Sequence, residues 1–97
     1  MRIRWTAQAS TDLDNIEAYI ALDNRGAAIR TVLDIIDAVK RLEDYPASGR
    51  AGRVVGTREL VLSNKPFIVP YRVRNNIIEI LRVFHTSRRI AYFDPNL

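Results

Sequence analysis

The sequence TRELVLSNKPFIVPYRVRNNIIEILRVFHTSRR, residues 57–89, contains three runs rich in Val, Ile, Leu and Phe that are separated by short polar segments. Runs of this length and composition, bounded by turn residues, are typical of β-strands. We place the strands at residues 58–62, 67–73 and 77–84. A basic cluster, residues 85–89, follows the last strand, and this is where we expect function.

Details inside this stretch indicate how the strands are arranged. Asn75 and Asn76 suit the positive φ angles of a tight hairpin turn. The last strand is apolar on both faces, which predicts a central place in the sheet. Pro70 cannot donate to a strand ladder, so we expect a sheet edge or a bulge at this residue.

Two amphipathic helices are predicted before these strands. Thr6 can cap a helix over residues 7–22, and Asn24 can cap a second over residues 25–44. Only a short break separates them, so they should form an antiparallel hairpin. Residues 2–5 alternate polar and apolar, which indicates a short first strand.

The predicted fold class is α+β, with the order βααβββ and an antiparallel sheet that packs one face against the N-terminal helix hairpin. The 97 residues, of which 47% are hydrophobic and 27% charged, fit a single domain spanning residues 1–97. Trp5 should lie in the core or at its rim, and we expect Tyr19 and Tyr45 to be packing residues.

Composition excludes several classes of protein. With no cysteine and one histidine, a disulfide framework, a thiolate metal site and a histidine-rich zinc site are all unsupported, and we expect no cofactor. No apolar run approaches the roughly 20 residues that span a bilayer, and the first residues do not resemble a signal peptide. We therefore expect a cytoplasmic protein without a membrane partner.

Charge is divided unevenly along the chain. Residues 1–46 carry 6 Lys and Arg against 8 Asp and Glu, whereas residues 47–97 carry 9 against 3. This separation favours an anionic partner on one side of the protein, either nucleic acid or an acidic protein. A solvated basic face is the alternative interpretation.

The densest group able to bind phosphate comprises Arg82, His85, Arg88, Arg89 and Tyr92. Guanidinium groups match phosphate oxygens, an aromatic ring can stack on a base, and His85 can act as a general acid or base. The alternatives are a surface histidine that bonds a neighbour, and arginines that keep a sheet end soluble or grip an acidic partner. Ser87 does not complete a catalytic triad with His85.

The loop at residues 46–56 adds Arg50 and Arg53 and is a second candidate contact surface. Its end, Gly56-Thr57-Arg58, lacks the Gly-Lys-Ser/Thr ending of a phosphate-binding loop.

Taken with the βααβββ order, three motifs resemble the RelE/ParE superfamily of type II toxins. They are GR-x-GR-x-x-GTREL (49–60), PFIVPYRV (66–73) and IEILRVFHTSRR (78–89), and the resemblance covers residues 1 to about 92. The combination is similar to the ParE-like branch, often described as plasmid stabilisation proteins. The resemblance implies a toxin that arrests growth, works inside a hetero-oligomeric toxin–antitoxin complex, and is neutralised by a cognate antitoxin. Its helix hairpin and any exposed sheet edge would receive the antitoxin.

The resemblance implies one of two targets. ParE-like members inhibit DNA gyrase, whereas RelE-like members are metal-independent endonucleases that cut mRNA on the ribosome. The nucleases place cations where this chain has Glu59, Val61 and Ile68. Since losing one such cation can cost about 10²-fold in rate, we favour gyrase inhibition without a catalytic site.

A degenerate toxin that is retained only to bind its antitoxin is one alternative, and a ribosome-dependent endonuclease is the other. In that case the residues implied by the resemblance are Arg58, His85, Arg88 and Tyr92. For the gyrase inhibitor, the candidate contacts are the basic residues of the loop and of the C-terminal end, Arg50, Arg53, Arg82, His85, Arg88 and Arg89.

Overall fold

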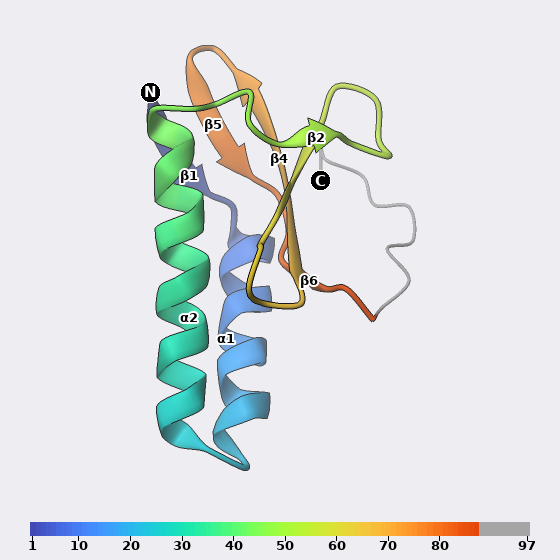
Figure 1. The fold of residues 1–97 in the computed structure, drawn as a ribbon. Helices are drawn as coiled ribbons and strands as arrows, with labels where there is room; N and C mark the ends of the chain where they lie inside the picture. The colour runs from blue at the N-terminus through green and yellow to red at the C-terminus, as the bar shows by residue number, and fades with distance from the viewer. Residues whose placement is uncertain (88–97) are drawn as a thin grey trace.

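The computed structural model describes residues 1–87 of the chain. In this range the fold is α+β, as predicted, with two helices between the first strand and the remaining ones (Figure 1). The elements are β1 (Arg2–Trp5), α1 (Ala7–Ala21), α2 (Arg25–Lys40), a 3₁₀ turn (Arg41–Glu43), β2 (Arg50–Ala51), β3 (Arg58–Val61), β4 (Phe67–Arg74), β5 (Ile77–Ile80) and β6 (Phe84–His85).

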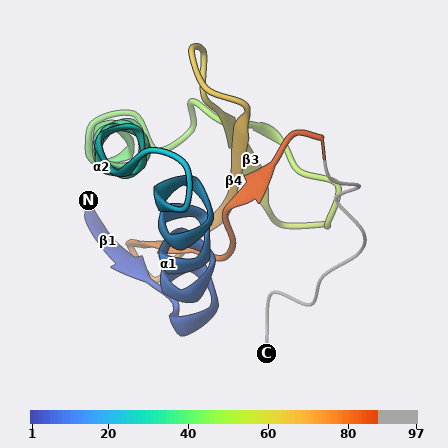
Figure 2. The same ribbon diagram turned by 90° about the horizontal axis from the view of Figure 1, so that it is seen from below.

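The helix hairpin forms where the capping residues predict it. The side chain of Thr6 accepts a hydrogen bond from the Ala9 N–H, and that of Asn24 accepts one from the Ala27 N–H. Helices α1 and α2 lie side by side on one side of the sheet (Figures 1 and 2). Helix α2 ends at Lys40, short of the predicted residue 44, because the chain tightens into the 3₁₀ turn.

The strand order is β1-β5-β4-β3-β2, with β6 also pairing with β4. Strand β5 lies between β1 and β4, so the first half of the predicted third strand is interior to the sheet, whereas its end, in β6, pairs with β4 alone. All pairs are antiparallel except β1 with β5, which run parallel, so the sheet is mixed rather than antiparallel throughout as predicted. Both helices and three strands separate β1 from β5 along the chain, so no hairpin turn fixes their relative direction. The hairpin between β4 and β5 turns through Asn75 and Asn76, which have φ angles of 55° and 60° as expected.

Pro70 is not at a sheet edge, because β4 lies between β5 and β3. The alternative expectation was a bulge, and one occurs in the neighbouring strand. Tyr71 pairs with Ile80 and Ile68 pairs with Phe84, so the chain opposite β4 contains one extra residue. The Pro70 carbonyl accepts from Leu81 N–H at 2.9 Å, so the missing Pro70 donor faces this bulged side. The bulge divides the predicted third strand into β5 and β6.

Alternation along the strands sends apolar side chains toward the helices and polar ones to the opposite side. The core between the layers includes Ile35, Leu42, Val69, Tyr71, Ile78 and Ile80, and Trp5 packs at its rim as predicted. The expectation for Tyr19 and Tyr45 was wrong, because they are 78% and 67% exposed. We call the side opposite the helices the outer face; its polar residues include Arg2, Arg4, Arg50, Glu59, Arg72, Arg74 and Glu79.

Candidate functional site

Tyr71 in the core fixes the start of the candidate contact loop. Its phenol oxygen accepts from the Gly49 N–H at 2.9 Å and donates to the Pro46 carbonyl at 2.8 Å. A Cβ added at Gly49 would lie 2.6 Å from atoms of the Tyr71 ring and hydroxyl, so glycine is required there. The buried tyrosine therefore sets the position from which Arg50 enters the sheet, a role that the sequence motifs did not reveal.

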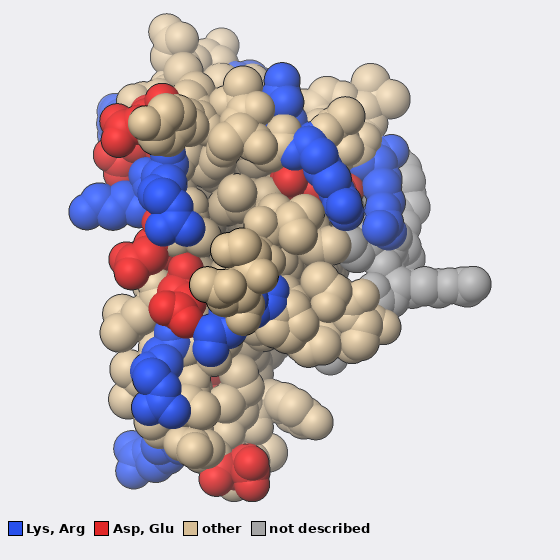
Figure 3. Space-filling model, in the orientation of Figure 1, with Lys and Arg blue, Asp and Glu red and all other residues tan. Residues whose placement is uncertain are grey.

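Arg50 and Arg53 meet at one buried carboxylate. The Arg50 Nε and Nη2 atoms donate to one oxygen of Glu59 at 3.1 and 2.9 Å, and the Arg53 backbone N–H donates to the other at 3.1 Å. Glu59 is only 2% exposed, while the Arg50 side chain remains half exposed. Basic side chains gather over β2 and the loop that follows it, whereas α2 mixes both signs of charge (Figure 3). The structure thus brings Arg50 and the backbone of Arg53 to the same carboxylate.

The side chain of Arg58 forms hydrogen bonds to the same loop. Its Nη1 atom donates to the carbonyls of Ala47 and Gly49 at 3.2 and 2.9 Å. These bonds close the loop against the start of β3. The guanidinium therefore has a structural role in addition to any role in binding.

Arg82 is partly buried and is anchored to α1. Its Nε and Nη2 atoms donate to the two carboxylate oxygens of Asp12 at 2.7 and 3.1 Å, and the Val83 N–H adds a third bond at 2.9 Å. The hydrogen bond to Asp12 raises the pKa of Arg82 despite partial burial. The guanidinium also lies 4.7 Å from the ring centre of Phe84. Arg82 thus ties the bulge to α1, so its main role is to position the segment that leads to His85.

His85 sits at the end of the sheet with its ring held on two sides. The Ser87 N–H donates to Nδ1 at 3.1 Å, and the Phe67 ring meets the imidazole edge-on with centroids 5.3 Å apart. Because Nδ1 accepts, a neutral ring in this arrangement carries its proton on Nε2. This agrees with the interpretation of a histidine bonded to a neighbour. The other predicted members of this cluster, Arg88, Arg89 and Tyr92, lie outside the described residues.

The positions expected to hold cations in a nuclease do not form an anion site. Glu59 is paired with Arg50, Ile68 is buried at 6% exposure, and Val61 presents an apolar side chain at 46% exposure. Residues 1–87 also hold no group of three His, Asp or Glu side chains that could bind a metal ion. In the same range, no helix is long and apolar enough to cross a bilayer.

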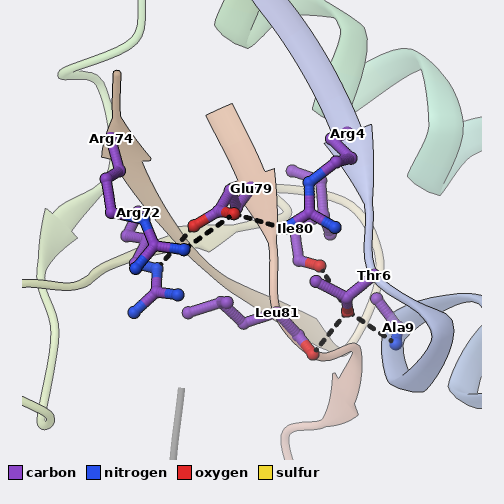
Figure 4. Close-up of polar contacts among 8 residues, drawn as sticks. All are labelled: Arg4, Thr6, Ala9, Arg72, Arg74, Glu79, Ile80 and Leu81. Carbon is purple, nitrogen blue, oxygen red and sulfur yellow. Dashed lines mark hydrogen bonds and ion pairs between the residues drawn. The ribbon is translucent and has the colours of Figure 1, made fainter. Parts of the chain in front are cut away.

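A second arginine cluster, which the sequence motifs did not single out, surrounds Glu79 on the outer face (Figure 4). The Arg72 Nε donates to one carboxylate oxygen at 2.6 Å, while Arg4 and Arg74 donate to the other, Arg74 at 3.4 Å. The sequence shows only that arginines alternate with apolar residues, as Arg-x-Arg in β1 and again at the end of β4. That signal does not reveal which carboxylate lies between the two pairs.

Burial alone would raise the pKa of Glu79, because a low-dielectric environment disfavours the charged form. Hydrogen bonds from Arg4 and Arg72 and the positive charges of Arg72 and Arg74 outweigh burial and lower the pKa from 4.5 to about 2. Glu79 is therefore ionised at any physiological pH.

Comparison with known proteins identifies the family. The family described as "ParE toxin of type II toxin-antitoxin system, parDE" matches residues 3–90. The chain belongs to this family of ParE toxins. The protein Y4kP of Sinorhizobium fredii is 51% identical over 88 residues, which cover 91% of each chain. Toxin RelE2 of Caulobacter vibrioides is 33% identical over 87 residues, covering 90% of this chain and 97% of that protein.

A solved structure supports the same family. A chain of the chromosomal ParDE toxin–antitoxin system from P. aeruginosa superposes with a TM-score of 0.81 at 37% identity, covering 90% of this chain and 97% of that one. The identity and coverage place the similarity across 90% of this chain rather than in one motif.

The depressed pKa of Glu79 predicts acid-sensitive stability. A folded-state pKa below the unfolded value stabilises the protein above pH 4.5, and this stabilisation is lost as the pH falls toward about 2. We expect Glu79→Gln to remove roughly 1–3 kcal/mol of this acid dependence, measured by urea unfolding over a pH series. Glu17→Gln, which changes an exposed carboxylate of α1, should leave the pH dependence intact. Equal acid dependence in both variants would contradict the role assigned to Glu79.

Proposed function

We propose that this ParE-family toxin acts in the cytoplasm by inhibiting DNA gyrase, without cutting nucleic acid itself. The main support for the proposal comes from the side chains at the three positions where nucleases of the superfamily hold cations. One is a glutamate neutralised by Arg50, one is a buried isoleucine and one is an exposed valine. A strained phosphorane needs preorganised positive charge, and none of these three side chains supplies a cation.

The proposed contact surface lies on the loop after β2 and at the sheet end. Arg50 and Arg53 are held close together through Glu59, and His85 presents its ring where β6 leaves the sheet. Arg88 and Arg89, which follow His85 in sequence and lie outside the described residues, are proposed as further contacts. Arg82 is proposed to act indirectly, because its ion pair with Asp12 positions the chain that leads to these residues.

Gyrase assays with purified toxin test this proposal. The wild-type protein should inhibit supercoiling and trap cleaved DNA complexes, and Arg53→Glu should weaken inhibition by about tenfold or more, because it reverses a charge in the contact loop. Arg30→Glu, the same change on exposed α2, is the matched control and should inhibit normally. Unaltered supercoiling in the presence of excess wild-type toxin would overturn the proposal.

Ribosome-dependent mRNA cleavage is the second candidate, favoured by the 33% identity to toxin RelE2. The same toxin preparation should therefore be tested by toeprinting on translating ribosomes. New mRNA ends that disappear in a His85→Ala/Arg88→Ala double variant would replace the gyrase proposal with this one. We expect no new ends.

We further propose that a cognate antitoxin neutralises this toxin by docking on α2 in a hetero-oligomeric complex. Ile29, Leu33 and Ile36 recur at helical spacing and are 56%, 53% and 38% exposed, which leaves an apolar stripe on the side of α2 turned away from the core. An amphipathic antitoxin helix would cover this stripe. Strand β1, at the edge of the sheet, offers unpaired backbone groups for an extended segment.

Leu33→Glu tests the docking surface. A charge in the middle of the stripe should weaken antitoxin binding by about tenfold or more in titration calorimetry, because truncating an interface anchor costs more than about 1 kcal/mol. Gyrase inhibition should persist, because Leu33 is outside the core. Val55→Glu makes the same change at a residue that is 97% exposed on the opposite layer and should not alter antitoxin binding. Equal affinity of Leu33→Glu and wild-type toxin would show that the antitoxin binds elsewhere.

A further inference from the structure

We infer that the outer face of the sheet carries a binding site for the sugar–phosphate backbone of nucleic acid, formed by Arg2, Arg4, Arg72 and Arg74 around Glu79. We call these residues the arginine face. Arg2 and Arg4 belong to β1 and Arg72 and Arg74 to β4, while Glu79 lies on β5 between them. The inference goes beyond gyrase inhibition, because it concerns direct contact with nucleic acid whatever the protein target.

The arginine face has a surplus of positive charge. Three guanidinium groups, those of Arg4, Arg72 and Arg74, contact the Glu79 carboxylate, and Arg2 lies one outward position away on β1, so the cluster keeps a net charge of about +3. Arg2 is exposed and has no ion pair within residues 1–87. The side chains of Arg4 and Arg74 are 54% and 52% exposed although both contact Glu79. One arginine would be enough to form a structural ion pair with Glu79. A structural role therefore does not account for the other arginines of the cluster.

Glu79 holds the exposed arginines in place without using up their donors. Each guanidinium has five N–H groups, and Arg4 and Arg74 each give a single one, from Nη2, to the carboxylate. The remaining donors on these half-exposed groups face solvent or a ligand. Adjacent strands are roughly 4.8 Å apart, so the β1 and β4 arginines form two rows about 10 Å apart on either side of β5. Preorganised cations reduce the entropic cost of binding.

The neighbouring side chains favour a phosphate backbone over other anions. A protein partner obtains most of its affinity from apolar anchors, but the outward positions of β1, β4 and β5 offer only Ile77, because Ile68 and Pro70 of β4 are buried. These same positions carry no aromatic ring on which a base could stack. Guanidinium groups that contact only phosphates recognise negative charge and do not distinguish one base sequence from another. We therefore expect binding that is sequence-independent and strongly dependent on salt.

Fluorescence anisotropy with short labelled DNA oligonucleotides, single-stranded and duplex, tests the inference. The full-length toxin should bind unrelated sequences with similar affinity, and log K should fall linearly with log salt. Arg74→Gln should weaken binding several-fold for every sequence and lower the salt slope by about one, because each phosphate contact contributes about 0.9 to the slope for duplex DNA. Arg2→Gln, which breaks no ion pair, should have a similar effect and remains informative if Arg74→Gln folds poorly.

Arg30→Gln on α2 is the control, because it removes the same charge from the helical layer and should change the salt slope little. The inference is overturned if the wild-type toxin does not bind at low salt, or if Arg30→Gln loses as much affinity as Arg74→Gln. It is also overturned if a labelled poly-glutamate peptide binds more tightly than DNA and shows the same loss in Arg74→Gln, because the face would then suit an acidic protein. Gyrase inhibition is measured in a separate assay. A failure of nucleic-acid binding by the arginine face can therefore be distinguished from a failure of gyrase inhibition.

Discussion

The carboxylate of Glu79 connects three strands through one buried charge. It accepts hydrogen bonds from Arg4 on β1 and from Arg72 and Arg74 on β4, while its own strand lies between them. Leaving such a carboxylate unpaired would cost several kcal/mol, because the group is only 5% exposed. The contact between Arg4 and Glu79 therefore specifies where β1 adds to the sheet. Apolar packing of Ile3 and Trp5 on the other face stabilises the same position.

A second buried glutamate that pairs with arginine lies two strands away, and this pair is relevant to function. Glu59 on β3 is buried and paired with Arg50 of β2, which holds the contact loop against the sheet. In both places a glutamate buried on the outer face positions arginines that remain half exposed. This arrangement suits binding through fixed positive charge.

Local signals predicted much of the fold from the sequence. The caps at Thr6 and Asn24 and the turn at Asn75 and Asn76 depend on residues that are close in the chain, so their patterns are readable. The parallel direction of β1 and the bulge opposite Pro70 depend on pairings between distant residues, and the sequence did not reveal them. Tyr19 and Tyr45 were misjudged because an aromatic residue on or beside a helix does not by itself indicate which face is buried.

The candidate site was predicted less completely for the same reason. Arg50 and Arg53 meet at Glu59, which is close to both in the chain, but Arg82 has a partner 70 residues away, and Arg4 meets Glu79 across 75 residues. A double-mutant cycle on Arg72 and Glu79 tests most directly whether this carboxylate organises the sheet. Urea unfolding of Arg72→Gln, Glu79→Gln and the double variant should give a coupling energy of about 1–3 kcal/mol, as expected for a buried charge pair. Additive effects, with coupling below about 0.5 kcal/mol, would contradict the account.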